Sequence, residues 1–235
     1  MSKAERSEKR EAKPRPPLPP YSRGEEICNM VTHIVGGAFA VSALVLCVIM
    51  AAVRGSAWGV VSGAIYGASM ILLYTMSSLY HGLVPERAKR VFRVIDHCTI
   101  YILIAGTYTP ICLAAIRRAD PVMAWVLFGV IWGAAILAVT LTAVDMHKFK
   151  IFSLIAYVVM GWAVIVRIGN VAAILGARAT AFLVAGGVLY TVGAVLYVVG
   201  KKKNTPYIHS VFHLFVLLGS ISHFFTILLD VMPLR

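Results

Sequence analysis

The chain has 235 residues, of which 60% are apolar and only 14% are charged, and its formal net charge is +12. Soluble domains carry about 25% charged residues, so this composition excludes an ordinary soluble protein and predicts a single membrane-embedded domain. The basic residues lie at the termini and in short loops, without the basic stripe and interleaved aromatic residues of a nucleic-acid-binding surface, so no nucleic-acid partner is expected.

The N-terminal segment differs from the rest of the chain. Residues 1–20 are rich in Lys, Arg, Glu and Pro, and the segment ends in the run PPLPP. It lacks the apolar core of a signal peptide, and its composition is typical of disordered chain. We therefore expect a disordered, basic cytoplasmic arm over residues 1–20 and a transmembrane domain over residues 21–235.

Seven later stretches are long and apolar enough to cross a bilayer, whose hydrocarbon core of about 30 Å needs about 20 helical residues. Their length and lack of alternation argue against β-strands. The predicted fold class is therefore all-α, a seven-transmembrane helix bundle. The predicted spans are residues 27–53, 58–80, 95–116, 122–144, 149–168, 180–199 and 209–232.

The orientation of the bundle follows from its basic residues. Most of the 22 Lys and Arg residues fall in the N-terminal arm and in the second, fourth and sixth loops. Basic loops favour the cytoplasm. The N-terminus is therefore predicted to be cytoplasmic and the C-terminus to lie outside, which an odd number of spans requires.

With this orientation, several polar residues reach one depth near the cytoplasmic face. His81 closes the second span, and His209 and His213 open the seventh. Residues four apart share one face of a helix, so His209 and His213 can bind one metal ion together. A third imidazole from His81 would leave one tetrahedral position open, as in catalytic zinc sites. We predict a metal site with these three ligands; zinc suits it best, although imidazole also binds iron, copper and nickel.

Two further residues are candidates for chemistry at this depth. Asp96 opens the third span, and it is expected to hold a metal-bound water, to act as a general base or to orient a ligand imidazole. The structural alternative is an ion pair with Arg93 or Lys89. Ser77 lies one turn before His81 on the same face, where it can donate to a ligand, to water or to an oxyanion. Its structural alternative is a bond to its own helix backbone.

Other polar side chains have less definite roles. Glu26, Asn29 and His33 form a stripe at the inner end of the first span, which either contacts the site or substrate or serves as a helix cap and interfacial anchor. His223 lies about 15 Å beyond His213 along the seventh span. That separation is too large for one metal ion, so His223 is expected to be a packing or cavity residue.

These motifs resemble the bacterial hemolysin III proteins, the prokaryotic branch of the progestin and adipoQ receptor (PAQR) family. The resemblance covers residues from about 21 to 235. The matching segments are EEICNMVTH at 25–33, SSLYH at 77–81, DHC at 96–98, AGTYTP at 105–110 and HSVFH at 209–213.

The resemblance implies a multi-pass protein of the bacterial inner membrane, with seven helices, a cytoplasmic N-terminus and a zinc ion near the inner face. It implies that His81, His209 and His213 are the zinc ligands, that Asp96 holds zinc-bound water and that Ser77 is the serine of the family motif. The wider superfamily includes alkaline ceramidases, which implies hydrolysis of lipid amides with a membrane lipid as substrate or ligand.

Three functions are consistent with these features. The first is a zinc-dependent intramembrane hydrolase of lipid amide or ester bonds. The second is a non-enzymatic receptor or lipid-homeostasis sensor with a structural zinc. The third and least favoured is a cytolysin, because a secreted toxin would need a soluble form. The sequence leaves open whether the chain is an enzyme, which lipid it binds and its oligomeric state.

Overall fold

The computed structural model describes residues 17–234, which form helices and no strands. The predicted arm over residues 1–20 falls mostly on residues 1–16, outside the described part of the chain. The helical elements are α2 (Arg23–Val53), α3 (Ala57–Gly82), α4 (Glu86–Pro110), η1 (Ile111–Ile116), α5 (Arg117–Ala119), α6 (Pro121–Asp145), α7 (Lys150–Trp162), η2 (Ala163–Arg167), α8 (Ile168–Lys202), α9 (Ile208–Thr226) and η3 (Ile227–Val231).

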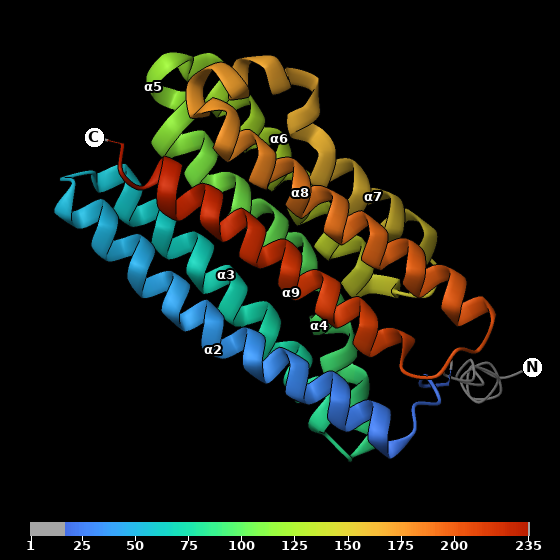
Figure 1. Ribbon diagram of the computed structural model, residues 1–235. Helices are drawn as coiled ribbons and strands as arrows, with labels where there is room; N and C mark the ends of the chain where they lie inside the picture. Colours follow the sequence, from blue (N-terminus) through green and yellow to red (C-terminus); the bar gives the residue numbers. More distant parts are fainter. Residues whose placement is uncertain (1–16, 235) are drawn as a thin grey trace, which may run out of the picture.

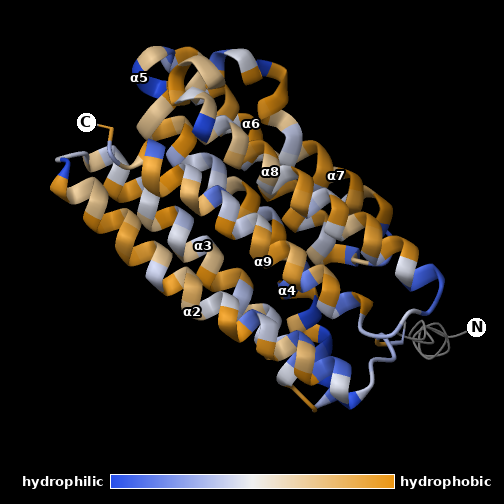
Figure 2. Cartoon of the chain, in the orientation of Figure 1, coloured by the Kyte–Doolittle hydropathy of each residue, from blue (hydrophilic) through white to orange (hydrophobic). Residues whose placement is uncertain are grey.

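The bundle is apolar on its outside. Six helical segments of the described chain are long and apolar enough to cross a membrane. In Figure 2 the helices are mostly orange along their length, and hydrophilic residues gather at the two ends of the bundle. Large aliphatic side chains such as Ile49, Val130 and Leu137 are about half exposed, whereas a water-soluble protein would bury such groups. The predicted all-helical membrane fold is therefore confirmed, and the chain is a multi-pass membrane protein.

The predicted spans 149–168 and 180–199 belong to one helical segment of 53 residues, Lys150–Lys202. This segment is not straight. Gly176 has φ 83°, a left-handed backbone conformation that glycine adopts without steric cost. Trp162 at the end of α7 donates from Nε1 to Thr191 Oγ1 of α8 at 2.9 Å. The chain therefore doubles back between α7 and α8, and the two helices lie beside each other in Figure 1.

The two ends of the described chain lie at opposite ends of the bundle (Figure 1). Helix α2 begins at a capping box, in which Glu25 N donates to Ser22 Oγ at 3.2 Å and Ser22 N donates to a Glu25 carboxylate oxygen at 2.8 Å. Reciprocal caps of this kind satisfy backbone donors at a helix start. The cap fixes where α2 begins, next to the end of α3 and the start of α9.

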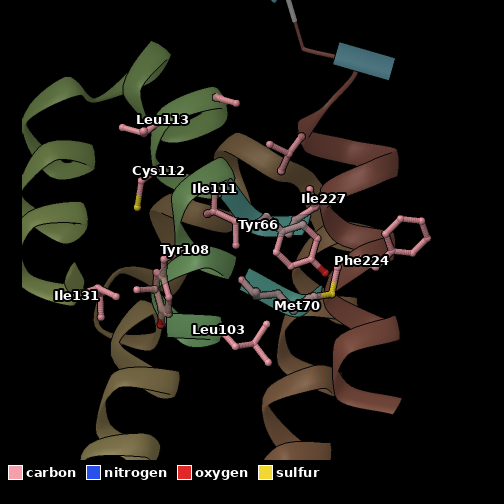
Figure 3. Close-up of a cluster of buried hydrophobic side chains, with 14 of the residues drawn as sticks. Tyr66, Met70, Leu103, Tyr108, Ile111, Cys112, Leu113, Ile131, Phe224 and Ile227 are labelled. Atoms are coloured by element: carbon pink, nitrogen blue, oxygen red, sulfur yellow. The ribbon is translucent and has the colours of Figure 1, made fainter. Parts of the chain in front are cut away.

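The apolar core receives buried side chains from most of the helices, and many of its large members lie on α3, α4, η1, α9 and η3. Figure 3 shows Tyr66 and Met70 of α3 beside Phe224 and Ile227, with Tyr108 and Ile111 on the neighbouring chain segment. Tyr66, Met70 and Ile227 are almost completely buried. Close packing of this kind stabilises a bundle in lipid, where apolar contact alone does not favour helix association.

Candidate metal centre

The structure brings the three predicted ligands together. His81 comes from the last turn of α3, and His209 and His213 come from the first turns of α9. All three are buried, and one ring nitrogen from each lies within 4.8 Å of the others. The Nε2 atoms of His209 and His213 are 3.1 Å apart. Two nitrogens bound to one tetrahedral zinc at about 2.0–2.1 Å lie about 3.3 Å apart, so the cluster has the dimensions of a metal site.

Hydrogen bonding within the cluster agrees with this assignment. His81 Nε2 is buried and has no hydrogen-bond partner in residues 17–234, while its Nδ1 lies 2.6 Å from Glu26 Oε2. His213 Nδ1 donates to the Asn29 carbonyl oxygen at 3.1 Å. Buried polar atoms without partners are rare. A metal ion among the three rings would satisfy His81 Nε2, so the residues fit the metal that the sequence predicts.

Asp96 lies beside this cluster and is not part of it. The carboxylate is buried, 3.7 Å from His97 Nδ1, and within electrostatic reach of His81. The expected alternative partners are not used: Lys89 pairs with Glu26 at 2.7 Å, and no ion pair between Asp96 and Arg93 occurs in the described chain. Asp96 therefore lies beside the three imidazoles, outside the group of ring nitrogens that meet.

Ser77 is fully buried and lies near the Asp96 carboxylate. Its hydroxyl lacks a hydrogen-bond partner of good geometry among the described residues. The structural alternative, a bond to its own helix backbone, is therefore not realised, although Ser78 makes such a bond to the Tyr74 carbonyl oxygen at 2.7 Å. The Ser77 hydroxyl therefore lies toward the Asp96 carboxylate and is not bonded to its own helix backbone.

A cavity of about 210 Å³ adjoins the cluster. At one end it is bordered by Ser77, Asp96, His209 and His213. Its walls are mostly apolar, and they include Leu73, Ile100, Leu103, Ile104, Phe212 and Val216. A mostly apolar cavity that reaches the histidines suits an apolar ligand with a polar group directed at them.

The other histidines have separate roles. His223 donates from Nε2 to the Leu183 carbonyl oxygen at 3.1 Å and also borders the cavity, so it has both of the roles expected for it. His97 Nδ1 donates to the Arg93 carbonyl oxygen at 2.9 Å. His33 stacks on the His213 ring with 3.6 Å between centroids, and neither of its nitrogens has a partner within residues 17–234. The polar stripe of Glu26, Asn29 and His33 therefore contacts the site, as the first of its two sequence interpretations expects, rather than serving only as a helix cap or interfacial anchor.

Sequence reasoning missed Tyr21, which stacks on the His209 ring at 5.3 Å between centroids. Burial raises the pKa of the Tyr21 hydroxyl well above its ordinary value, so it remains protonated and covers the site as a neutral group. Tyr21 precedes α2 and follows two prolines. No periodic pattern includes it, so the sequence holds no signal that would have identified its contact.

Comparison with known proteins agrees with these motifs. The haemolysin-III-related family model matches residues 21–224. The chain is 38% identical to Hemolysin-3 of Bacillus cereus over 209 residues, 89% of this chain and 93% of that protein. It is also 38% identical to a Hemolysin-3 homolog of Bacillus subtilis (strain 168) over 204 residues, 87% of this chain and 93% of that protein.

A more distant relative is the Monocyte to macrophage differentiation factor of Homo sapiens, a PAQR-family protein. It is 24% identical over 213 residues, which cover 86% of this chain and 83% of that protein. The resemblance read from the sequence is confirmed, and the chain belongs to the haemolysin-III-related family.

Proposed function

We propose that this chain is a zinc-dependent hydrolase of lipid amide or ester bonds in a bacterial inner membrane. One observation carries the proposal: three buried imidazoles meet beside Asp96 and Ser77 at the polar end of an apolar cavity. Three imidazoles leave one coordination position for water or substrate.

The proposal includes seven membrane crossings with the N-terminus in the cytoplasm. Helix α7 and η2 together have 18 residues, or about 27 Å at 1.5 Å per residue, and the chain turns back by the break at Gly176 near the start of α8. One of the six apolar segments contains both α7 and α8. If each of these helices crosses the membrane separately, the six segments make seven crossings. An odd number agrees with chain ends at opposite ends of the bundle. Lys89, Arg90 and Lys201 lie at the end that holds the histidines, which favours a cytoplasmic position for that end.

The residues of the site have complementary roles in this reaction. Zinc, when bound, supplies Lewis-acid polarisation of a carbonyl oxygen and lowers the pKa of water to about 7. Asp96 accepts the proton of the attacking water. Ser77 donates a hydrogen bond to the carbonyl oxygen as it becomes negative. Water adds to the carbonyl carbon, the C–N or C–O bond breaks, and the proton on Asp96 passes to the leaving amine or alcohol.

The cavity argues for a lipid substrate. Its apolar walls lead to the Asp96 end, so an acyl chain in the cavity would place its carbonyl group beside the histidines. Burial of each methylene group contributes about 0.8 kcal/mol. A substrate with a long acyl chain therefore gains affinity from the walls and orientation from the polar end.

The test is the Asp96→Asn variant. Purified zinc-loaded protein is incubated with ceramide or with phospholipid in micelles, and released fatty acid is measured by mass spectrometry. Wild type is expected to release fatty acid, and Asp96→Asn to be slower by about 10²–10⁴-fold because the proton acceptor is lost. Asp230→Asn is the matched control, because Asp230 pairs with Arg178 away from the histidines. Wild-type protein that releases no fatty acid, in an assay where an alkaline ceramidase does, would contradict the proposal.

A second candidate function is a receptor or lipid-homeostasis sensor with a structural zinc. The observation that favours it is the origin of the ligands, since His81 and His209 lie on α3 and α9 and one ion would cross-link the two helices. In that case His209→Ala lowers thermal stability and abolishes signalling, whereas Asp96→Asn preserves the phenotype. A folded Asp96→Asn protein without signalling would exclude this candidate.

A further inference from the structure

Glu26 at the start of α2 touches the candidate metal site without belonging to it. One carboxylate oxygen lies 2.6 Å from His81 Nδ1, and the other lies 2.7 Å from Lys89 Nζ. The Glu26 side chain is 16% exposed and that of His81 is fully buried. Short, charge-assisted bonds of this kind are stronger and more directional than neutral hydrogen bonds. Glu26 therefore links the end of α3 to α4 through two short contacts.

The contact with Glu26 determines which nitrogen of His81 faces the cluster. An ionised carboxylate only accepts hydrogen bonds, so the proton of a neutral His81 ring resides on Nδ1. The lone pair is then on Nε2, the buried atom without a partner in the described chain. A carboxylate behind a metal-binding imidazole holds the ring in place and makes its free nitrogen more basic.

Lys89 holds Glu26 in this position. Its Nζ also lies 3.4 Å from the His81 carbonyl oxygen and 3.3 Å from that of Leu83, at the end of α3. The carboxylate, the ammonium group and these backbone oxygens form a network contributed by α2, α3 and α4. Because this network is complete among protein groups, it can hold the His81 ring before any metal ion enters.

The next turn of α2 makes an equivalent contact with a second ligand. The Asn29 carbonyl oxygen accepts from His213 Nδ1 at 3.1 Å, and Asn29 Oδ1 accepts from Ser210 Oγ at 2.6 Å. Glu26 and Asn29 are three residues apart, on one face of the helix. One face of α2 therefore contacts ligands from α3 and α9, although it supplies no ligand itself.

We propose that Glu26 is a positioning residue that prepares His81 for metal binding, with Lys89 as its anchor. This inference rests on the metal site of the proposed function, and it adds a residue to which neither the motif resemblance nor the comparisons assign a role. In this role Glu26 does not contact the substrate. The expected effect is on metal affinity and on the ligand geometry around the ion.

The experiment measures metal affinity by competition with a chelator, using Zn²⁺ and Co²⁺ as probes on the full chain in detergent. Glu26→Ala is expected to weaken binding by about 100-fold, and Glu26→Gln by about 10-fold, because the amide oxygen still accepts from Nδ1 but lacks the charge. Glu25→Gln is the matched control. Glu25 is also a carboxylate at the start of α2, but it contacts Ser22 and the Tyr207 backbone N, at 2.9 Å, instead of a ligand. It is expected to keep wild-type affinity.

A second readout separates positioning from general stability. The visible absorption spectrum of bound Co²⁺ reports ligand geometry, and it is expected to change in Glu26→Ala and to remain unchanged in Glu25→Gln. If Glu26→Ala does not fold, the metal affinity of the near-isosteric Glu26→Gln variant provides the test. Wild-type affinity and spectrum in a folded Glu26 variant would overturn the role of Glu26 alone. A wild-type protein that binds neither ion would overturn the metal site itself, and one that binds zinc without hydrolysing lipid would overturn only the hydrolase.

Discussion

The two halves of α9 carry polar side chains in different arrangements. Following the proposed orientation, the half that begins at Ile208 is called the inner half and the half that ends at Thr226 the outer half. In the outer half, each polar group bonds to the adjacent α8: Ser222 Oγ donates to the Phe182 carbonyl oxygen at 2.7 Å, and Thr226 Oγ1 donates to that of Ala179 at 3.2 Å. In the inner half, His209 and His213 face each other and a third imidazole from α3. The outer groups bond to backbone carbonyl groups of a single neighbouring helix, whereas the two inner histidines meet each other and a third imidazole at a common point.

This contrast shows that residue type alone does not identify a functional site in a membrane bundle. Histidines occur in both halves of α9, yet His223 is held by a backbone carbonyl group as a serine or threonine would be. Polar side chains of that kind join helices in lipid. A metal site requires instead that ring nitrogens from separate helices meet without protein partners, as His81 Nε2 does within the described chain.

The largest expected effect comes from removing a histidine in the inner half. His213→Ala deletes one of three proposed ligands, so metal affinity is expected to fall by more than the roughly 100-fold that loss of a supporting residue causes. His223→Ala is the matched control on the same helix and is expected to retain the metal. Metal content by mass spectrometry of the purified proteins tests both. Equal metal loss in the two variants would remove the distinction between the halves.

A smaller effect is expected at the contact between α8 and the outer half of α9. A Cβ atom on Gly186 would overlap the His223 ring and approach the Gly219 carbonyl oxygen at 3.1 Å. Gly186→Ala is therefore expected to destabilise the fold by about 1–3 kcal/mol through overpacking. A Cβ atom on Gly129 would meet nothing within 4 Å, so Gly129→Ala is the control. Thermal unfolding in detergent measures both, and equal midpoints would contradict this close packing.

Much of the inner half could be predicted from the sequence. The spacing of His209 and His213 places them on one face, and the count of spans places His81 at the same depth, so simple helix geometry brings the three together. The ion pair of Lys89 could not be predicted, because Glu26 and Asp96 both lie near that depth. Side-chain packing between three helices decides the partner, and no sequence period describes that packing.

The region between α7 and α8 was less predictable in detail. Two spans separated by a loop were expected over 149–168 and 180–199, but the structure has continuous helical segments with a break at Gly176. Residues 169–179 contain several alanines and no proline. Alanine favours helix, so helix continues on both sides of the connection, and the chain breaks only at Gly176, whose left-handed backbone glycine tolerates.

The smallest expected effect concerns Ser220, between the two halves of α9. Its Oγ lies 2.7 Å from the Tyr74 hydroxyl and 2.8 Å from that of Tyr190. Hydrogen bonds in membrane bundles contribute about 0.6 kcal/mol on average, so Ser220→Ala is expected to cost about 1 kcal/mol in thermal unfolding. Ser42→Ala is the control, because Ser42 is exposed and bonds only to its own helix.

The same variant sharpens the comparison between the halves. The Tyr74 ring meets His33 edge-on at 5.1 Å, and His33 stacks on His213, so a chain of ring contacts leads from Ser220 to a proposed ligand. If the halves are independent, Ser220→Ala lowers stability and leaves zinc affinity unchanged. A fall in zinc affinity in Ser220→Ala, with no change in Ser42→Ala, would instead show that the hydrogen bonds of Ser220 help to position His213. The residues that support the metal site would then reach the middle of α9.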